Sequence, residues 1–113
     1  MEERYPFIAV YITASGRNGT LYIGVTSNLW ARVWEHKNGK YKGFAAKYGC
    51  TRLVWFERHP FMKAAIQREK SLKRYERKWK LDLIEAENPD WRDLSEGWYP
   101  ETTNRWLFDP DNP

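Results

Sequence analysis

Five polar residues of this chain carry side chains suited to phosphate chemistry: Tyr11, Tyr22, Arg32, His36 and Glu69. The two tyrosines lie within two apolar runs, whereas the arginine and the histidine stand four residues apart and would share one face of a helix. Glu69 falls inside the apolar stripe of a later helical segment. A phenol, a guanidinium, an imidazole and a carboxylate are together what phosphodiester cleavage with one metal ion requires.

Each of these residues also has a structural interpretation that involves no chemistry. Arg32 and His36 could be surface side chains that flank the apolar stripe of their helix. A carboxylate such as Glu69 that faces a core needs a partner, which could be an arginine or a lysine. The partner could equally be a hard divalent cation such as Mg²⁺, which takes one or two carboxylates together with water and phosphate oxygens.

The strands that must position the tyrosines are predicted from continuous apolar runs over residues 7–12 and 20–25. Asn18-Gly19 between them is typical of a hairpin turn. A third strand is expected over residues 51–57, which are rich in strand-forming residues.

Three helices are expected, over residues 28–37, 60–74 and 76–87. Residues 40–50 are predicted to form a basic, aromatic loop in which Phe44 belongs to the core. The predicted fold class is therefore α+β: a small three-stranded mixed or antiparallel sheet flanked by helices, in the order β-β-α-β-α-α.

One domain is expected over residues 1–99, with residues 89–99 docked on it as an extension. Residues 100–113 form an acidic tail that contains tryptophan and proline, and residues 107–113 are expected to fray. The chain has 113 residues, so a single modest core is the expectation.

The net charge of +4 conceals a basic body and an acidic end, because residues 1–86 carry a net charge of +9 and residues 87–113 one of −5. A basic body predicts a polyanionic partner, of which DNA is the expected one, although a solvated basic surface would give the same count. Tyr41, Phe44 and Tyr48 could stack on exposed bases or could equally belong to the core, and for Phe44 the core is the expectation. The basic residues expected to contact DNA are Lys37, Lys40, Lys42, Lys47, Lys70, Lys73, Arg74 and Arg77.

Several classes of protein and site are disfavoured. No apolar run is long enough to span a bilayer, and the N-terminus lacks the pattern of a signal peptide. The single cysteine, Cys50, cannot form an internal disulfide, so we expect a cytoplasmic protein. With DNA as the expected partner, the protein would be nucleoid-associated. No zinc spacing, glycine-rich phosphate loop or Ser or Cys nucleophile pattern is present.

These residues resemble a known family. Val10-Tyr11-Ile12 followed by Tyr22-Ile23-Gly24 is similar to the paired motif of the GIY-YIG endonuclease superfamily, and Arg32, His36 and Glu69 follow in that family's order. The resemblance covers about residues 7–86 and is strongest to the short, stand-alone bacterial members.

The resemblance implies a role for each residue. Tyr22 would be the general base, Tyr11 would position water or phosphate, and Arg32 would hold the scissile phosphate. His36 would assist with that phosphate or relay a proton, and Glu69 would hold one Mg²⁺ or Mn²⁺ ion.

The resemblance further implies that Gly24 keeps the end of its strand clear for close backbone approach. Many relatives carry a lysine directly after this glycine, where this chain has Val25. A free tyrosine has a pKa of about 10, so it needs a nearby cation, a metal-bound water or a hydrogen-bond network to act as a base. Arg17, Arg32 and Lys73 are the candidate cations in place of the missing lysine.

The function that follows is a metal-dependent DNA endonuclease, directed by DNA structure and acting in repair, recombination or processing. The alternative is a weak or inactive nucleic-acid-binding module that needs a partner protein. A protein partner docked through the acidic tail and a homodimer both remain open.

Overall fold

A computed structural model describes residues 6–40 and 43–99 of the chain. Its elements are, in chain order, β1 (Ala9–Ala14), β2 (Leu21–Thr26), α1 (Leu29–Lys37), α2 (Phe44–Lys47), β3 (Arg52–Arg58), α3 (Met62–Lys73) and α4 (Arg77–Glu87). The predicted α+β class is confirmed, and the sheet is antiparallel throughout. The segment predicted as a loop over residues 40–50 differs, because it contains the short helix α2.

The sheet has the strand order β2-β1-β3, so β1 is central and β2 forms one edge. Every residue of β1 is buried, which explains the unbroken apolar run of that strand. Asn18 adopts a positive φ of 56° in the β1–β2 turn, as its Asn-Gly sequence predicts. The register between β1 and β3 shifts after Ile12, and Val54 is the additional residue on β3.

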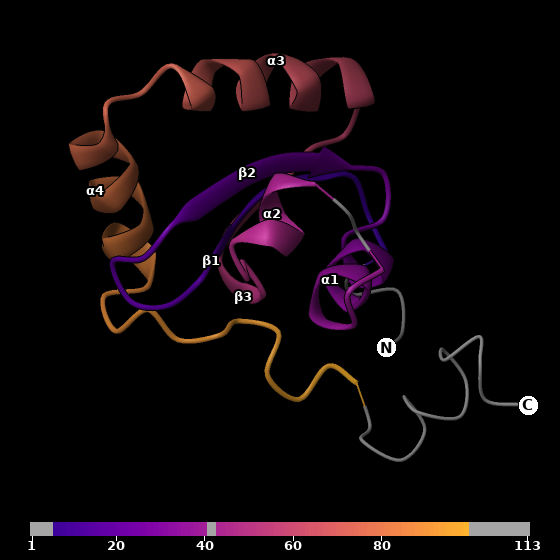
Figure 1. The fold of residues 1–113 in the computed structure, drawn as a ribbon. Coiled ribbons are helices and arrows are strands. Elements are labelled where there is room, and N and C mark those ends of the chain that lie inside the picture. Colours follow the sequence, from indigo (N-terminus) through magenta and orange to yellow (C-terminus); the bar gives the residue numbers. More distant parts are fainter. Residues whose placement is uncertain (1–5, 41–42, 100–113) are drawn as a thin grey trace, which may run out of the picture.

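The two faces of the sheet are covered by different helices (Figure 1). On one face, Val10 and Ile12 pack with Ala65 and Leu72 of α3 and with Ile84 of α4. On the other face, the side chains of β1 pack with α1 and with β3, in the cluster of Ala9, Tyr11, Leu29, Val33 and Leu53. Helix α3 also contacts β2, so it reaches the edge strand that carries the second tyrosine.

Residues 88–99 run back across the domain, as the prediction of a docked extension requires. The Asn88 side chain donates to the backbone oxygen of Val54, and the Leu94 backbone N–H donates to that of Leu53. Trp91 is completely buried in the core cluster of α3 and α4. Tyr99 donates to the backbone oxygen of Trp30 at 2.6 Å and thereby ties the segment to α1. We refer to residues 88–99 as the C-terminal strap; the predicted tail over residues 100–113 lies outside the described residues.

None of the helices in the described part of the chain is both long and apolar enough to cross a membrane.

Candidate functional site

Tyr11, Tyr22 and His36 meet on the face of the sheet that α1 covers. In the register of β1 and β2, Tyr11 pairs with Gly24 and Thr13 pairs with Tyr22, so the two tyrosines project on the same side. The Tyr11 and Tyr22 ring centroids are 6.2 Å apart, and each lies 5.5 Å from the imidazole of His36. The Tyr11 hydroxyl and Nε2 of His36 form a buried hydrogen bond of 2.9 Å.

Gly24 makes room for this arrangement. A Cβ atom on Gly24 would lie 2.5 Å from the Tyr11 hydroxyl oxygen and 2.6 Å from Cζ of the same ring. The close neighbour that Gly24 accommodates is thus the Tyr11 side chain, rather than an approaching backbone as predicted. The third residue of the second motif therefore fixes the position of the tyrosine of the first.

Helix α1 places His36 over the tyrosines. The Asn28 side chain caps the helix by accepting from the Ala31 backbone N–H at 3.0 Å, and Leu29 and Val33 bury one face of it. His36 is only 5% exposed, so the interpretation of it as a surface side chain is wrong. Burial, with a further contribution from the charge of Arg32, lowers the pKa of His36 to about 4. The imidazole is therefore neutral at neutral pH, and one of its ring nitrogens can accept a proton.

Arg32 lies one turn before His36 on the same helix. Its Nε atom pairs with Oε1 of Glu35 at 2.9 Å, and its side chain is 30% exposed. The guanidinium is thus close enough to influence the pKa of His36 while part of it remains open to solvent.

Glu69 lies on α3, which covers the other face of the sheet, and Lys73 of the same helix connects it to the pocket that Tyr22 lines. Ala65 and Leu72 of its predicted apolar stripe are buried, but Ile66 is 37% exposed, so the stripe is narrower than expected. The Glu69 side chain is 12% exposed and pairs with the ammonium of Lys73 at 2.6 Å. The lysine partner that the structural interpretation required is therefore present.

The residues fit a cation held by one carboxylate. No group of three or more His, Cys, Asp or Glu side chains that could enclose a metal occurs among residues 6–40 and 43–99. Mg²⁺ does not need such a cage, because it keeps several water ligands and uses phosphate oxygens of a substrate. Glu69, largely buried and held by a lysine that is itself 54% exposed, can supply one carboxylate once that lysine moves aside.

A pocket of about 300 Å³ connects the two halves of the site along the edge strand β2. Its lining includes Tyr22 from the tyrosine cluster and Lys73, the partner of Glu69. We call it the β2-edge pocket; its lining residues are Leu21, Tyr22, Ile23, Phe44, Lys73 and Lys80.

Two of these lining residues differ from the sequence predictions. Phe44 was expected in the core, but it is 51% exposed and forms a wall of the pocket. Lys80 was not among the predicted DNA contacts, since the chain turns between α3 and α4 and no local spacing links Lys80 to Tyr22. Of the cations considered as partners for the general base, Lys73 lies in the same pocket as Tyr22. Val25, which stands where many relatives have a lysine, packs against the core on the opposite face of the sheet.

The predicted DNA-contacting residues fall into three groups. Lys40, Lys47, Lys70, Lys73 and Arg74 are exposed, and Lys42 lies outside the described residues. Arg77 is exposed but donates to the backbone oxygens of Asn18 and Gly19 in the β1–β2 turn. Lys37 is only partly exposed and binds Asp93 of the strap and the Thr51 backbone oxygen, so it serves the fold.

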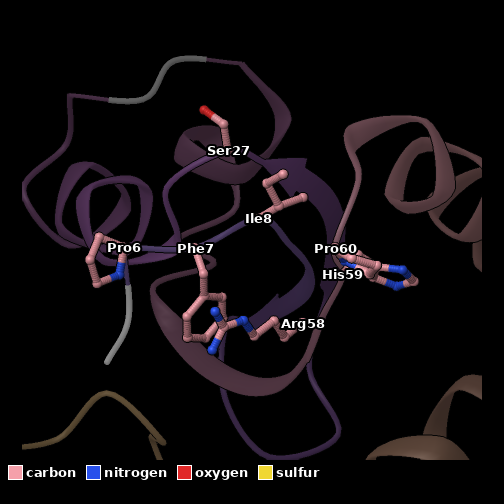
Figure 2. Close-up of a pocket in the computed structure, with 7 residues that line it drawn as sticks. All are labelled: Pro6, Phe7, Ile8, Ser27, Arg58, His59 and Pro60. Atoms are coloured by element: carbon pink, nitrogen blue, oxygen red, sulfur yellow. The ribbon is translucent and has the colours of Figure 1, made fainter. Parts of the chain in front are cut away.

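A second, larger pocket of about 570 Å³ lies where β1 begins and β3 ends (Figure 2). Two of its polar side chains, Arg58 and His59, already have partners in the protein. The guanidinium of Arg58 lies 4.8 Å from the centroid of the Phe7 ring, and Nε2 of His59 contacts Glu57 at 2.8 Å. None of the five predicted catalytic residues lines it.

Comparison with known proteins identifies a family for the chain. The family model of the GIY-YIG catalytic domain matches residues 7–82. A UPF0213 protein of Staphylococcus epidermidis is 38% identical over 80 residues, which cover 67% of this chain and 92% of that protein. A UPF0213 protein of Syntrophus aciditrophicus is 39% identical over 75 residues, 63% of this chain and 82% of that protein. No solved structure matches the chain.

Proposed function

The chain belongs to the GIY-YIG family of nucleases, and we propose that it is a metal-dependent endonuclease that hydrolyses phosphodiester bonds in DNA. The observation that carries the proposal is the cluster of Tyr11, Tyr22 and His36, whose second tyrosine opens into a pocket with Lys73 and Lys80. Phenol and imidazole groups for proton transfer thus adjoin ammonium groups that can bind a phosphate.

Tyr22 is the proposed general base. It lies at the wall of the β2-edge pocket, where a water molecule could approach a bound phosphate, and it takes the proton of that water. The ammonium of Lys73 in the same pocket would favour the phenolate form of Tyr22. Tyr11 and the neutral His36 hold each other through their hydrogen bond and keep Tyr22 in place by ring packing.

Cationic side chains from α1 and α3 are proposed to hold the scissile phosphate. The exposed part of Arg32 can bind phosphate oxygens, and its guanidinium can offset the charge that develops on them in the transition state. Lys73 pairs with Glu69 in the free protein. A bound phosphate would draw the Lys73 ammonium away from the Glu69 carboxylate. Glu69 would then hold one Mg²⁺ or Mn²⁺ ion, which polarises the phosphate and supports the leaving oxygen.

We further propose that the protein selects DNA by structure, in repair, recombination or processing, in a cytoplasmic, nucleoid-associated setting. The catalytic domain matches only 76 residues, from 7 to 82, which offer little surface for recognising a long sequence. A short recognition surface favours branches, flaps or ends over a restriction site.

The test is cleavage of labelled branched, flapped and plain duplex DNA with Mg²⁺, with Mn²⁺ or with EDTA. Glu69→Gln, which keeps the size of the side chain and removes its charge, is expected to abolish metal-dependent cleavage. Glu87→Gln is the matched control, because Glu87 is an exposed glutamate on α4. Cleavage that survives Glu69→Gln or EDTA would show that the assignment of the metal is wrong.

The alternative is a nucleic-acid-binding module that needs a partner protein for cleavage. The observation that favours it is the ion pair between Glu69 and Lys73, which already satisfies the carboxylate without a metal. Salt-dependent binding to DNA with no cleavage of any substrate would support this alternative, and affinity that does not change with salt would argue against it.

A further inference from the structure

Phe44 of α2 and Tyr48, the residue that caps the end of this helix, present two aromatic rings to solvent. Their side chains are 51% and 45% exposed, and the ring centroids lie 4.7 Å apart with the planes tilted by 44°. The ammonium of Lys47 lies 5.5 Å from the centroid of the Tyr48 ring. Paired aromatic rings that remain in water with a lysine beside them resemble a surface for binding a flat ring.

The backbone beneath these rings is anchored, so their position is fixed by the fold. Ala45 is 1% exposed, and its carbonyl accepts a hydrogen bond of 2.9 Å from the backbone N–H of Cys50. The Tyr48 N–H donates to the carbonyl of Phe44, which closes the helical turn. Helix α2 packs against β2, and therefore holds Phe44 against the edge of the sheet that carries Tyr22.

The β2-edge pocket combines this aromatic wall with two ammonium groups. Phe44 lies on its boundary with Tyr22, Lys73 and Lys80. Lys73 pairs with Glu69, but an apolar ligand would offer neither ammonium group an anion to bind, whereas inorganic phosphate would leave the exposed ring unused. A nucleotide satisfies both, because its base has an apolar face and its phosphate is anionic.

We infer that the β2-edge pocket binds the base of an unpaired nucleotide, which stacks on Phe44 while Lys73 and Lys80 contact the adjoining phosphate. The base must be unpaired, because the faces of a base in a duplex are covered by its stacked neighbours. Since Tyr22 lines the same pocket, this nucleotide lies next to the bond to be cleaved. This inference rests on the proposed function, and it names the feature by which DNA structure is selected.

Binding measured in EDTA, where no metal-dependent cleavage interferes, tests the inference separately from catalysis. The probes are one oligonucleotide as a single strand and as a plain duplex, each with 2-aminopurine as a reporter of stacking. Phe44→Ala is expected to weaken binding of the single strand about 5- to 150-fold, the equivalent of about 1–3 kcal/mol for one stacked base. Binding of the duplex should stay within about 2-fold.

The matched control is Phe61→Ala, because Phe61 is a phenylalanine that is 68% exposed and lies outside the β2-edge pocket. Phe44→Trp should retain both the affinity and the fluorescence change, since tryptophan offers a larger stacking surface. Lys80→Ala should weaken binding of the single strand and lower the slope of log affinity against log salt by about 0.7.

Equal effects of Phe44→Ala and Phe61→Ala, or equal losses for single strand and duplex, would overturn the inference. Because binding is measured in EDTA, these results test the stacking site separately from the proposed nuclease activity. Binding that depends on Phe44 without any cleavage would leave the stacking site in place and refute the nuclease. Cleavage that requires Glu69 but does not depend on Phe44 would support the nuclease and refute the stacking site.

Discussion

Replacing Gly24 with alanine would put a methyl group into space that the Tyr11 ring occupies. The new Cβ would lie 2.5 Å from the hydroxyl oxygen, 2.6 Å from Cζ and 2.9 Å from Cε1 of that ring. Tyr11 is completely buried in the central strand, so the ring cannot swing into solvent. It must move within a packed core and lose its 2.9 Å hydrogen bond to His36.

The cost can be estimated from these contacts. One excess methyl group in a packed core destabilises by about 1–3 kcal/mol, and the lost hydrogen bond adds about 1 kcal/mol. Alanine returns about 0.5–1 kcal/mol, because it restricts the unfolded chain more than glycine does. The sum is a loss of about 1–3.5 kcal/mol, or a fall in Tm of about 4–15 °C for a domain of this size.

Urea and thermal unfolding measure this loss, and cleavage is assayed well below both values of Tm. Cleavage should fall by about 100-fold, because a displaced Tyr11 no longer packs correctly on Tyr22 and His36. Gly16→Ala is the matched control, since a Cβ at Gly16 meets nothing within 4 Å, and its stability should change by less than about 0.5 kcal/mol. Equal effects of the two substitutions would refute the reasoning, as would additivity of Gly24→Ala with Tyr11→Ala, which removes the ring that the methyl group strikes.

Three further predictions concern other parts of the molecule. The pKa of His36 is lowered from 6.5 to about 4 in the folded protein, so its neutral form contributes stability that is complete above about pH 6.5 and is lost as the pH falls towards 4. That contribution is about 3 kcal/mol, and urea titrations at several pH values should show a much smaller dependence over this range in His36→Gln. Tyr99→Phe removes the hydrogen bond to the Trp30 carbonyl and should lower the free energy of unfolding by about 1 kcal/mol; no change would mean that this contact does not secure the strap. Lys70→Ala should weaken DNA binding and reduce its salt slope by about 0.7–0.9, whereas Lys37→Ala should mainly lower stability, and the opposite pattern in anisotropy titrations and melting curves would contradict the assignment.

Local patterns in the sequence were sufficient for the three strands and the three long helices, but not for the short helix α2. The apolar runs around Tyr11 and Tyr22 predict both strands of the hairpin to within two residues. The run in β1 is unbroken because that strand is central and completely buried. The four-residue spacing of Arg32 and His36 predicts that both side chains lie on one face of a helix. The resemblance to a known motif brought the two tyrosines and the histidine to one site, and the structure places them together.

Contacts between distant segments could not be predicted in this way. Phe44 was expected in the core because an aromatic residue usually is, and a four-residue helix is too short to show which side chains face outward. Lys37 resembles any other basic residue until Asp93, which follows it by 56 residues, is found beside it. The burial of His36 could not be predicted from its neighbours in sequence either, because it depends on the tyrosines of two strands.

The C-terminal strap also determines which segment of this chain would have to be transferred to obtain an intact domain. The match to the catalytic domain ends at residue 82, within α4, yet Trp91 fills the core nine residues later and Tyr99 holds the helix that carries His36. A chimaeric nuclease that contained only residues 7–82 of this chain would have a cavity where the Trp91 indole ring lies. The transplantable unit extends to Tyr99, and its boundary is set by packing and not by the extent of sequence similarity.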